Sequence, residues 1–280
     1  MTSSLILAIV TFVYGFSSVF YISSWIFNKK ILARIGAALA VVAIFGNIAG
    51  FILRWVESYG HGYGHIPLSN LYESLVFFAL TIAVVCLFLE WKYKNSHINA
   101  FSISLAFLIF AYASLKAGQG AGDIQPLIPA LKSNWLTVHV MTCFLGYAGF
   151  AIAFGISIMY LAKKALSNNG KGLMGRLPDY DLLDELTQQT VMFGFLFLSL
   201  GIITGSVWAN SAWGSYWTWD PKETWSLITW FVYAIFLHLR HVRGWNGTKI
   251  AMISIIGFMA VMFTYFGVNY LPGLHSYGKG

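Results

Sequence analysis

The sequence contains few charged residues. Only 10% of its 280 residues are Asp, Glu, Lys or Arg, whereas a soluble globular domain carries roughly 25%. Hydrophobic residues make up 58%, which leaves too few polar side chains to cover a surface that faces water. This deficit excludes an ordinary soluble domain and predicts that most of the protein is surrounded by lipid.

Cysteine is also scarce. The two cysteines, Cys86 and Cys143, lie inside apolar runs and form neither a CxxC nor a CxxCH motif. We therefore expect no disulfide framework, no cysteine-based zinc site and no covalent haem attachment to this chain. We also expect no cleavable signal peptide, because the first apolar run, 3–27, is too long for one and no basic segment precedes it.

Long apolar runs occupy most of the chain. A membrane-spanning helix needs about 20 apolar residues. Eight runs approach or exceed that length: 3–27, 35–53, 70–91, 98–115, 137–162, 189–208, 224–240 and 249–270. They predict an all-α, polytopic integral membrane bundle of about eight transmembrane helices. We find neither a soluble domain nor an internal repeat, so we expect one membrane domain, 1–280.

The basic residues lie in short turns between these runs, so the net charge of +7 indicates topology and not nucleic-acid binding. With the adjoining helix ends, one set of loops holds 12 Lys and Arg and the other set holds five. The richer set comprises 28–34, 92–97, 163–188 and 241–248. The positive-inside rule places these loops in the cytoplasm and both termini on the external side. Loop 163–188 is the one sizeable cytoplasmic segment.

Segment 208–225, on the predicted external side, is crowded with aromatic rings. Trp208, Trp213, Tyr216, Trp217, Trp219 and Trp225 fall within 18 residues. Aromatic belts at membrane interfaces use scattered Trp and Tyr at helix ends and not a dense run within a loop. Such rings beside Gly214 favour a platform for a large planar ligand.

A helix start is predicted at the end of this segment. Asp220 is placed to act as the N-cap, Pro221 occupies the first helical position, and Glu223 at the third position can reach back to the cap. We expect this cap to fix the angle between the aromatic segment and the helix that follows.

The stretch Trp213-Gly-Ser-Tyr-Trp-Thr-Trp-Asp220 matches the WGxxWxWD signature of the haem-handling proteins of cytochrome c maturation. Ser69–Leu75, His139-Val140, Leu145–Ala148, Leu237–Arg240 and Gly273–Gly278 extend the match. With these stretches the chain resembles, over nearly its whole length, the System II branch of CcsA or ResC type.

The resemblance implies delivery of haem b to apocytochrome c and its covalent attachment to the CxxCH motif, as a cytochrome c synthase (haem lyase) subunit. It also implies a CcsB- or ResB-type membrane partner, apocytochrome c and a thiol-reducing protein as partners. The implied location is the bacterial plasma membrane or the thylakoid membrane, with the active site on the periplasmic or lumenal side.

The resemblance further assigns His139 and His275, both on the predicted external side, as axial ligands of one haem iron. His238 lies 13 residues beyond Trp225, about 20 Å down the seventh run, and is implied as an iron ligand at an internal haem site. The residues expected to act in catalysis are Trp213, Trp217, Trp219 and Asp220. The further residues expected to contact haem are Trp208, Gly214, Tyr216, Trp225 and Arg54.

Several residues keep two interpretations. His61 and His65 are either extra ligands or solvated loop residues, and Glu73 bonds either a nearby polar group or a ligand. The external cations Arg54, Lys132 and Lys222 are candidate partners of the haem propionates or merely topology signals.

Two other functions compete with the synthase. A haem exporter would present haem without forming thioether bonds, and the sequence does not separate it from a synthase. A b-type electron-transfer subunit would want four histidines deep in the membrane, and only His238 lies deep.

Overall fold

The computed structural model describes residues 2–166 and 172–273, apart from the side chain at position 121. Within these residues the chain is all-helical, as predicted, with eight α-helices and no strand. The described residues form two compact units: unit 1 comprises 2–132 and 172–178, and unit 2 comprises 133–166 and 179–273.

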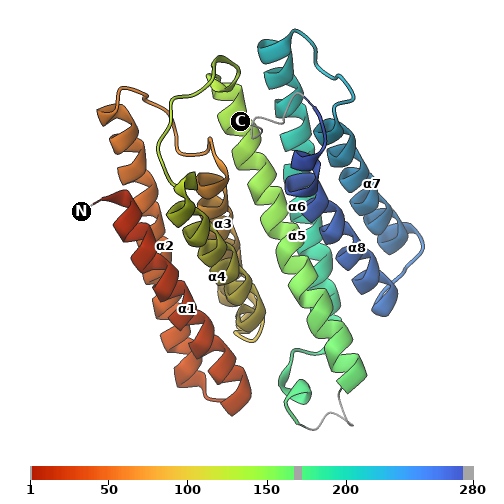
Figure 1. Ribbon diagram of the computed structural model, residues 1–280. Coiled ribbons are helices and arrows are strands. Elements are labelled where there is room, and N and C mark those ends of the chain that lie inside the picture. Colours follow the sequence, from red (N-terminus) through yellow and green to blue (C-terminus); the bar gives the residue numbers. More distant parts are fainter. Residues whose placement is uncertain (1, 167–171, 274–280) are drawn as a thin grey trace. The chain divides into compact units, whose positions relative to one another are not determined.

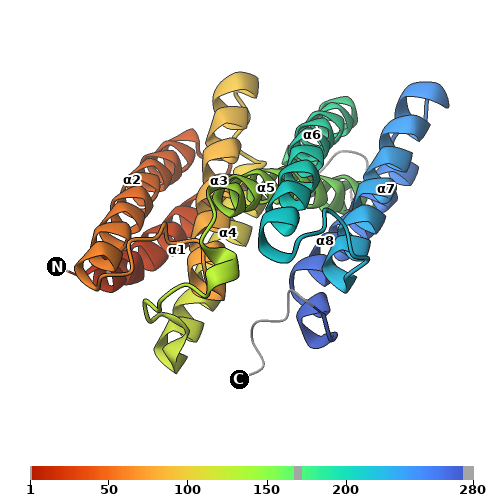
Figure 2. The same cartoon turned by 90° about the horizontal axis from the view of Figure 1, so that it is seen from above.

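Unit 1 contains four long helices (Figure 1; Figure 2). They are α1 (Ser3–Phe27), α2 (Lys30–Gly60), α3 (Leu71–Tyr93) and α4 (Asn99–Lys116). Helix α1 packs against α2 and α4, and α3 packs against the same two helices. Tyr14, Phe78 and Phe110 are fully buried between them. Short turns follow at η1 (Ala117–Ala121), η2 (Pro129–Leu131) and η3 (Met174–Arg176).

Unit 2 contains the other four long helices (Figure 1). They are α5 (Asn134–Leu166), α6 (Tyr180–Trp213), α7 (Pro221–Val242) and α8 (Thr248–Tyr265), followed by η4 (Gly267–Tyr270). Helices α5 and α7 each contact both α6 and α8. Because these helices alternate in direction, the start of α5, the end of α6, the start of α7 and the end of α8 lie at one end of the unit.

Helices α5 and α6 pack with their backbones nearly in contact. A Cβ atom added at Gly149 would lie 2.7 Å from the carbonyl oxygen of Thr190, and one added at Gly194 would lie 2.9 Å from that of Gly146. Small residues permit this approach in membrane bundles, where close packing replaces the hydrophobic effect as the attraction between helices. The approach matters for the site, because it brings side chains of α5 onto the backbone of α6.

Each predicted apolar run overlaps one of the eight helices, and the first run matches the bounds of its helix, Ser3–Phe27. The predicted cytoplasmic loop 163–188 is shorter than expected, because α5 runs to Leu166 and α6 begins at Tyr180. By length and composition, seven of the helices can cross a membrane; α7 is the exception. Large apolar side chains such as Phe12 and Phe45 remain about two-thirds exposed on the outer faces, at 69% and 68%, where lipid would cover them.

Candidate functional site

His139 lies in the second turn of α5, and its ring rests on the backbone of α6. Its Nδ1 is 2.7 Å from the carbonyl oxygen of Gly201. The ring also lies over Gly205, where an added Cβ would be 2.6 Å from Nδ1. This position of the ring therefore depends on Gly201 and Gly205, which leave room for an imidazole between the two helices.

The contact with Gly201 selects one tautomer of the His139 ring. A backbone carbonyl only accepts hydrogen bonds, so Nδ1 carries the proton and donates it. The neutral imidazole then has its lone pair on Nε2, the nitrogen that ligates a metal when Nδ1 is held by a carbonyl. The Sγ atom of Cys143 lies 3.6 Å from Nδ1, the nitrogen that donates to Gly201.

Trp208 of α6 stands beside His139, and Trp213 of the same helix packs on Trp208. The ring of Trp208 is stacked parallel to the imidazole, with centroids 6.1 Å apart and planes at 12°. Trp213 meets Trp208 edge-on at 4.8 Å. Both residues belong to the last turns of the helix, and Trp208 is buried. The irregular part of the predicted aromatic segment is thus confined to residues 214–220, which we call the tryptophan loop.

The tryptophan loop begins at Gly214, whose left-handed conformation (φ 78°) ends α6 and directs its N–H to the carbonyl of Asn210. Tyr216 and Trp219 are exposed, and Trp217 meets Trp219 edge-on at 5.8 Å. Trp219 has φ 60°, a conformation that a bulky residue adopts only when its surroundings hold it there.

The first turn of α7 holds the tryptophan loop in place. The predicted capping box is confirmed: Asp220 accepts from the N–H of Lys222 at 2.9 Å, and the Glu223 side chain reaches back to the cap. One carboxylate oxygen of Glu223 accepts from the N–H groups of Thr218 and Asp220, at 2.7 and 3.3 Å. These bonds fix the backbone on both sides of Trp219. Among the described residues, the other oxygen of Glu223 has no hydrogen-bond partner although it is buried.

The chain after α8 returns to this cap. Gly273 lies directly against the Asp220 carboxylate, and a Cβ atom at position 273 would overlap it. The predicted iron ligand His275 follows two residues later and lies outside the described residues. Its assignment stays a prediction, and the approach of Gly273 brings the described end of the chain to the tryptophan loop.

His238 lies on α7 near the end opposite to the tryptophan loop. Tyr233 and Phe236 mark the buried face of this helix, whereas His238 shares its exposed face with Phe231 and Ile235. The predicted internal iron ligand therefore faces outward from unit 2.

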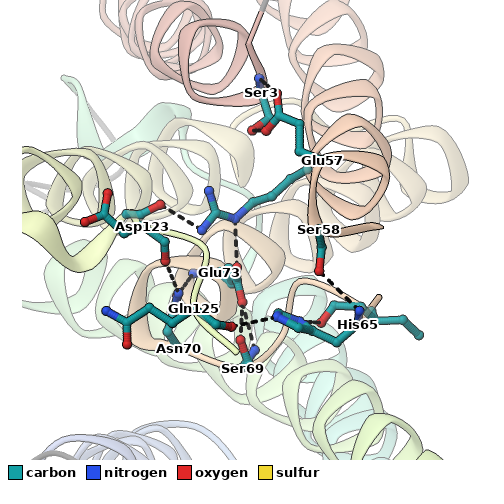
Figure 3. A network of polar contacts seen from close by, with 12 residues as sticks. Ser3, Glu57, Ser58, His65, Ser69, Asn70, Glu73, Asp123 and Gln125 are labelled. Atoms are coloured by element: carbon teal, nitrogen blue, oxygen red, sulfur yellow. Dashed lines mark hydrogen bonds and ion pairs between the residues drawn. The ribbon is translucent and has the colours of Figure 1, made fainter. Parts of the chain in front are cut away.

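Arg54, predicted to contact haem, lies in unit 1 and is buried. Its Nε is 2.8 Å from Glu73 Oε1, and its NH2 group donates to the carbonyl of Gly122 at 2.8 Å. The second Glu73 oxygen accepts from the backbone N–H and hydroxyl of Ser69 at 2.9 and 2.8 Å (Figure 3). This network joins α2, α3 and the segment after α4, so the geometry favours a structural role for Arg54 over a propionate role.

The two histidines of the glycine-rich loop differ. His61 is exposed beside Tyr63, as expected for a solvated loop residue. His65 is buried, and its Nδ1 and Nε2 lie 3.2 and 2.9 Å from the carbonyl oxygens of Ile66 and Gln125 (Figure 3). The expectation of a solvated residue is wrong for His65, and engagement of both ring nitrogens argues against iron ligation.

Sequence reasoning did not find the residues that seat His139 or those that pair with Arg54. Gly201 and Gly205 become part of the site only through the register of α5 against α6, which no local pattern reveals. The sequence did contain an indication of the Arg54–Glu73 pair, because these opposite charges lie near the predicted external ends of two consecutive apolar runs.

Comparison with known proteins identifies the relatives of the chain. The sequence model of the family described as "Cytochrome C assembly protein" matches residues 68–275. Cytochrome c biogenesis protein CcsA of Trieres chinensis is 36% identical over 99% of this chain and 96% of its own length. CcsA of Chlamydomonas reinhardtii is 40% identical over 94% of this chain and 74% of its own length. CcsA of Prochlorococcus marinus (strain MIT 9303) is 37% identical over 92% and 88%.

Among solved structures, the cytochrome c haem lyase CcmF has the same fold, with a TM-score of 0.68 at 18% sequence identity. The likeness covers 96% of this chain and 50% of CcmF.

Proposed function

Because the chain belongs to the cytochrome c assembly protein family, we propose that it delivers haem to apocytochrome c and takes part in joining that haem to the CxxCH segment. Family membership and the CcsA relatives support a role in cytochrome c maturation. The seven apolar helices support an integral membrane protein, with relatives from plastid-bearing algae and cyanobacteria.

The observation that carries the proposal is the position of the His139 ring against the backbone of α6 at Gly201 and Gly205. Its Nδ1 donates to Gly201, so the lone pair of the neutral ring is on Nε2, the nitrogen that binds a metal in such an arrangement. Trp208 stacks beside the ring, Trp213 packs on Trp208, and the tryptophan loop begins one residue after Trp213. A neutral imidazole next to a cluster of flat aromatic rings fits a porphyrin substrate, because the imidazole binds iron and the rings pack on the macrocycle.

In this proposal His139 and His275 hold the iron of haem b on the external side of the membrane. Trp213, Trp217 and Trp219 position the macrocycle, with Trp208, Tyr216 and Trp225 around them, and Asp220 fixes the loop. The cytochrome's two thiols add across the haem vinyl groups, each S–H supplying the new C–S and C–H bonds. The imidazole of CxxCH then replaces one histidine of this chain. The chain's contribution is orientation.

The proposal includes partners. A CcsB- or ResB-type membrane protein would complete the synthase, and a thiol-reducing protein would keep the CxxCH cysteines reduced. The name haem lyase, carried by the structural neighbour CcmF, agrees with attachment chemistry for this fold. The bilayer would be a bacterial plasma membrane or a thylakoid membrane.

The test is co-expression of this chain, its membrane partner and an apocytochrome c in cells without maturation genes of their own. Covalent haem staining of the cytochrome supports a synthase. We expect His139→Ala to reduce the stained product about tenfold or more, the usual effect of removing a group that binds or supports a metal. Added imidazole should restore part of it. His61→Ala, an exposed histidine of unit 1, is the matched control.

A haem exporter predicts a different result. Haem would copurify with the chain and depend on His139, yet the cytochrome would carry no covalent haem. Failure of the wild-type chain to bind haem under any of these conditions would reject both functions.

A further inference from the structure

The three cations predicted on the external side, Arg54, Lys132 and Lys222, have different surroundings in the structure. Arg54 is buried, and Glu73 and a backbone carbonyl occupy its guanidinium. Lys132 is exposed at the end of η2 in unit 1. Lys222 differs from both, because it belongs to the first turn of α7, directly after the tryptophan loop.

The Lys222 side chain lies against protein and is not fully in solvent. It is partly buried, and its ammonium lies within electrostatic range of the Cys143 thiol and the Asp220 carboxylate. Cys143 in turn lies 3.6 Å from Nδ1 of His139. The ammonium of Lys222 is therefore on the same side of unit 2 as the seat of His139.

No carboxylate of the described residues lies within 4.0 Å of the Lys222 ammonium. Burial lowers the pKa of this ammonium, which is the cost of removing a cation from water without a close counter-ion. The nearby acids serve the backbone instead: Asp220 accepts from the N–H of Lys222, and Glu223 accepts from Thr218 and Asp220.

The position of Lys222 on its helix strengthens this point. The N-terminal end of an α-helix carries a partial positive charge, so a lysine there is unfavourable for the helix itself. The same two positive charges together favour a bound anion. Helix α7 has 22 residues, so its N-terminus carries the partial charge of a long helix.

We propose that Lys222 binds a carboxylate of the haem substrate, one of its two propionates, while His139 holds the iron. This inference rests on the proposed function. The propionates are the charged groups on the rim of haem b, and an ammonium–carboxylate pair would fix the rotation of the macrocycle about its iron–histidine axis. That rotation decides where the vinyl groups lie and thus whether both thiols of a CxxCH segment reach them.

The experiment compares haem with haem dimethyl ester, in which both propionates are uncharged. The full-length wild-type chain, Lys222→Met and Lys249→Met are purified, and dissociation constants for both ligands are measured by absorption. Lys249 is the control: it lies in the same unit, in the first turn of α8 at the opposite end of α7, and is exposed.

The wild type should bind haem about tenfold or more tightly than the ester, the range of a charge-assisted hydrogen bond. Lys222→Met should weaken haem binding by a similar factor and remove most of the preference for haem. Lys222→Arg should keep much of it, and Lys249→Met should keep all of it. Thermal stability of each apoprotein separates a lost contact from a misfolded chain.

Two results overturn the inference in distinguishable ways. If Lys222→Met keeps the full preference for haem while wild type shows the spectrum of histidine-ligated haem, Lys222 does not bind a propionate and the proposed function stands. If neither wild type nor any variant binds haem, the inference and the proposed function fall together.

Discussion

At the scale of single residues, the chemistry of His139 depends on groups that carry no side chain. The ring can donate to Gly201 only because Gly205, one helical turn later on α6, leaves space for it. A carbonyl that accepts from the other ring nitrogen of a ligating histidine fixes its tautomer, and removing such a partner typically costs about 10–100-fold in metal affinity. The two glycines should therefore be as sensitive to substitution as the histidine.

Gly205→Ala tests this dependence with one methyl group. The new Cβ would lie 2.6 Å from Nδ1 of His139 and must displace the ring from Gly201. Alanine is a better helix former than glycine by about 0.5–1 kcal/mol, so α6 itself should not weaken. We expect haem retention to fall about tenfold or more, with protein abundance little changed, as measured by the haem-to-protein ratio and the absorption spectrum.

Gly60→Ala is the control for this substitution, because an added Cβ at that helical position meets nothing within 4 Å. It should leave haem retention unchanged. If Gly205→Ala retains wild-type haem with an unaltered spectrum, the ring does not need its contact with Gly201, and the tautomer argument is wrong.

The tryptophan loop shows which residue-scale features a sequence reveals. The cap formed by Asp220 and Glu223 is a local pattern of four positions, and it was predictable because every participant is close in sequence. The left-handed conformation of Trp219 was not predictable, because it opposes the preference of the residue. The bonds from Glu223 to the backbone on both sides of Trp219 impose it.

At the scale of elements, the length of an apolar run in the sequence predicts a helix well but does not predict the contacts between side chains of different helices. All eight predicted runs are helical over most of their length, because lipid requires every backbone group to be bonded within its own segment. The Trp208–Trp213 stretch was expected in a loop, yet it extends α6, since the aromatic rings pack on one another and on His139. Packing between helices is a long-range property that apolar length does not encode.

The Arg54–Glu73 pair is a buried ion pair between α2 and α3. Both side chains are almost fully buried, at 3% and 1% exposure. Removing one partner of such a pair leaves an unpaired buried charge and typically costs about 3–5 kcal/mol. We expect Arg54→Met and Glu73→Gln each to destabilise unit 1 by that order, and the double variant to be less destabilised than the sum, as measured by thermal unfolding in detergent.

Asp179→Asn provides the comparison, because Asp179 pairs with Lys163 at 4.0 Å while its own side chain is fully exposed. Exposed pairs contribute little to stability because water screens them, so this variant should unfold almost like wild type. Additive losses in the double variant would show that Arg54 and Glu73 act independently. Haem loss without any loss of stability in Arg54→Met would restore Arg54 as a candidate propionate partner.

At the scale of the whole molecule, α7 connects the tryptophan loop to a second histidine. Among the helices of the described residues, α7 alone is not marked by its composition as a membrane span, so eight spans with both termini outside stays a prediction. His238 lies 17 residues after Pro221, about 25 Å along the helix axis. Its face of α7 is exposed on unit 2 and otherwise carries apolar side chains such as Phe231 and Ile235.

This exposed face supports a partner that completes an internal haem site. A haem ligated by two histidines needs imidazoles on opposite sides of one iron. His241 follows His238 by three residues on the same helix, so the two cannot take opposite sides. We therefore predict that the second ligand belongs to another polypeptide, a CcsB- or ResB-type protein that packs on the exposed face of α7.

The haem-to-protein ratio measured with and without that partner tests the prediction. The chain alone should hold close to one haem, at the external site, and the complex close to two. His238→Ala should return the complex to one, whereas His241→Ala should behave as wild type, because His241 is exposed at the last turn of α7. Two tightly held bis-histidine haems in the partner-free wild type would contradict the prediction. So would a complex of His238→Ala that still holds two, because the internal haem would then be ligated without this residue.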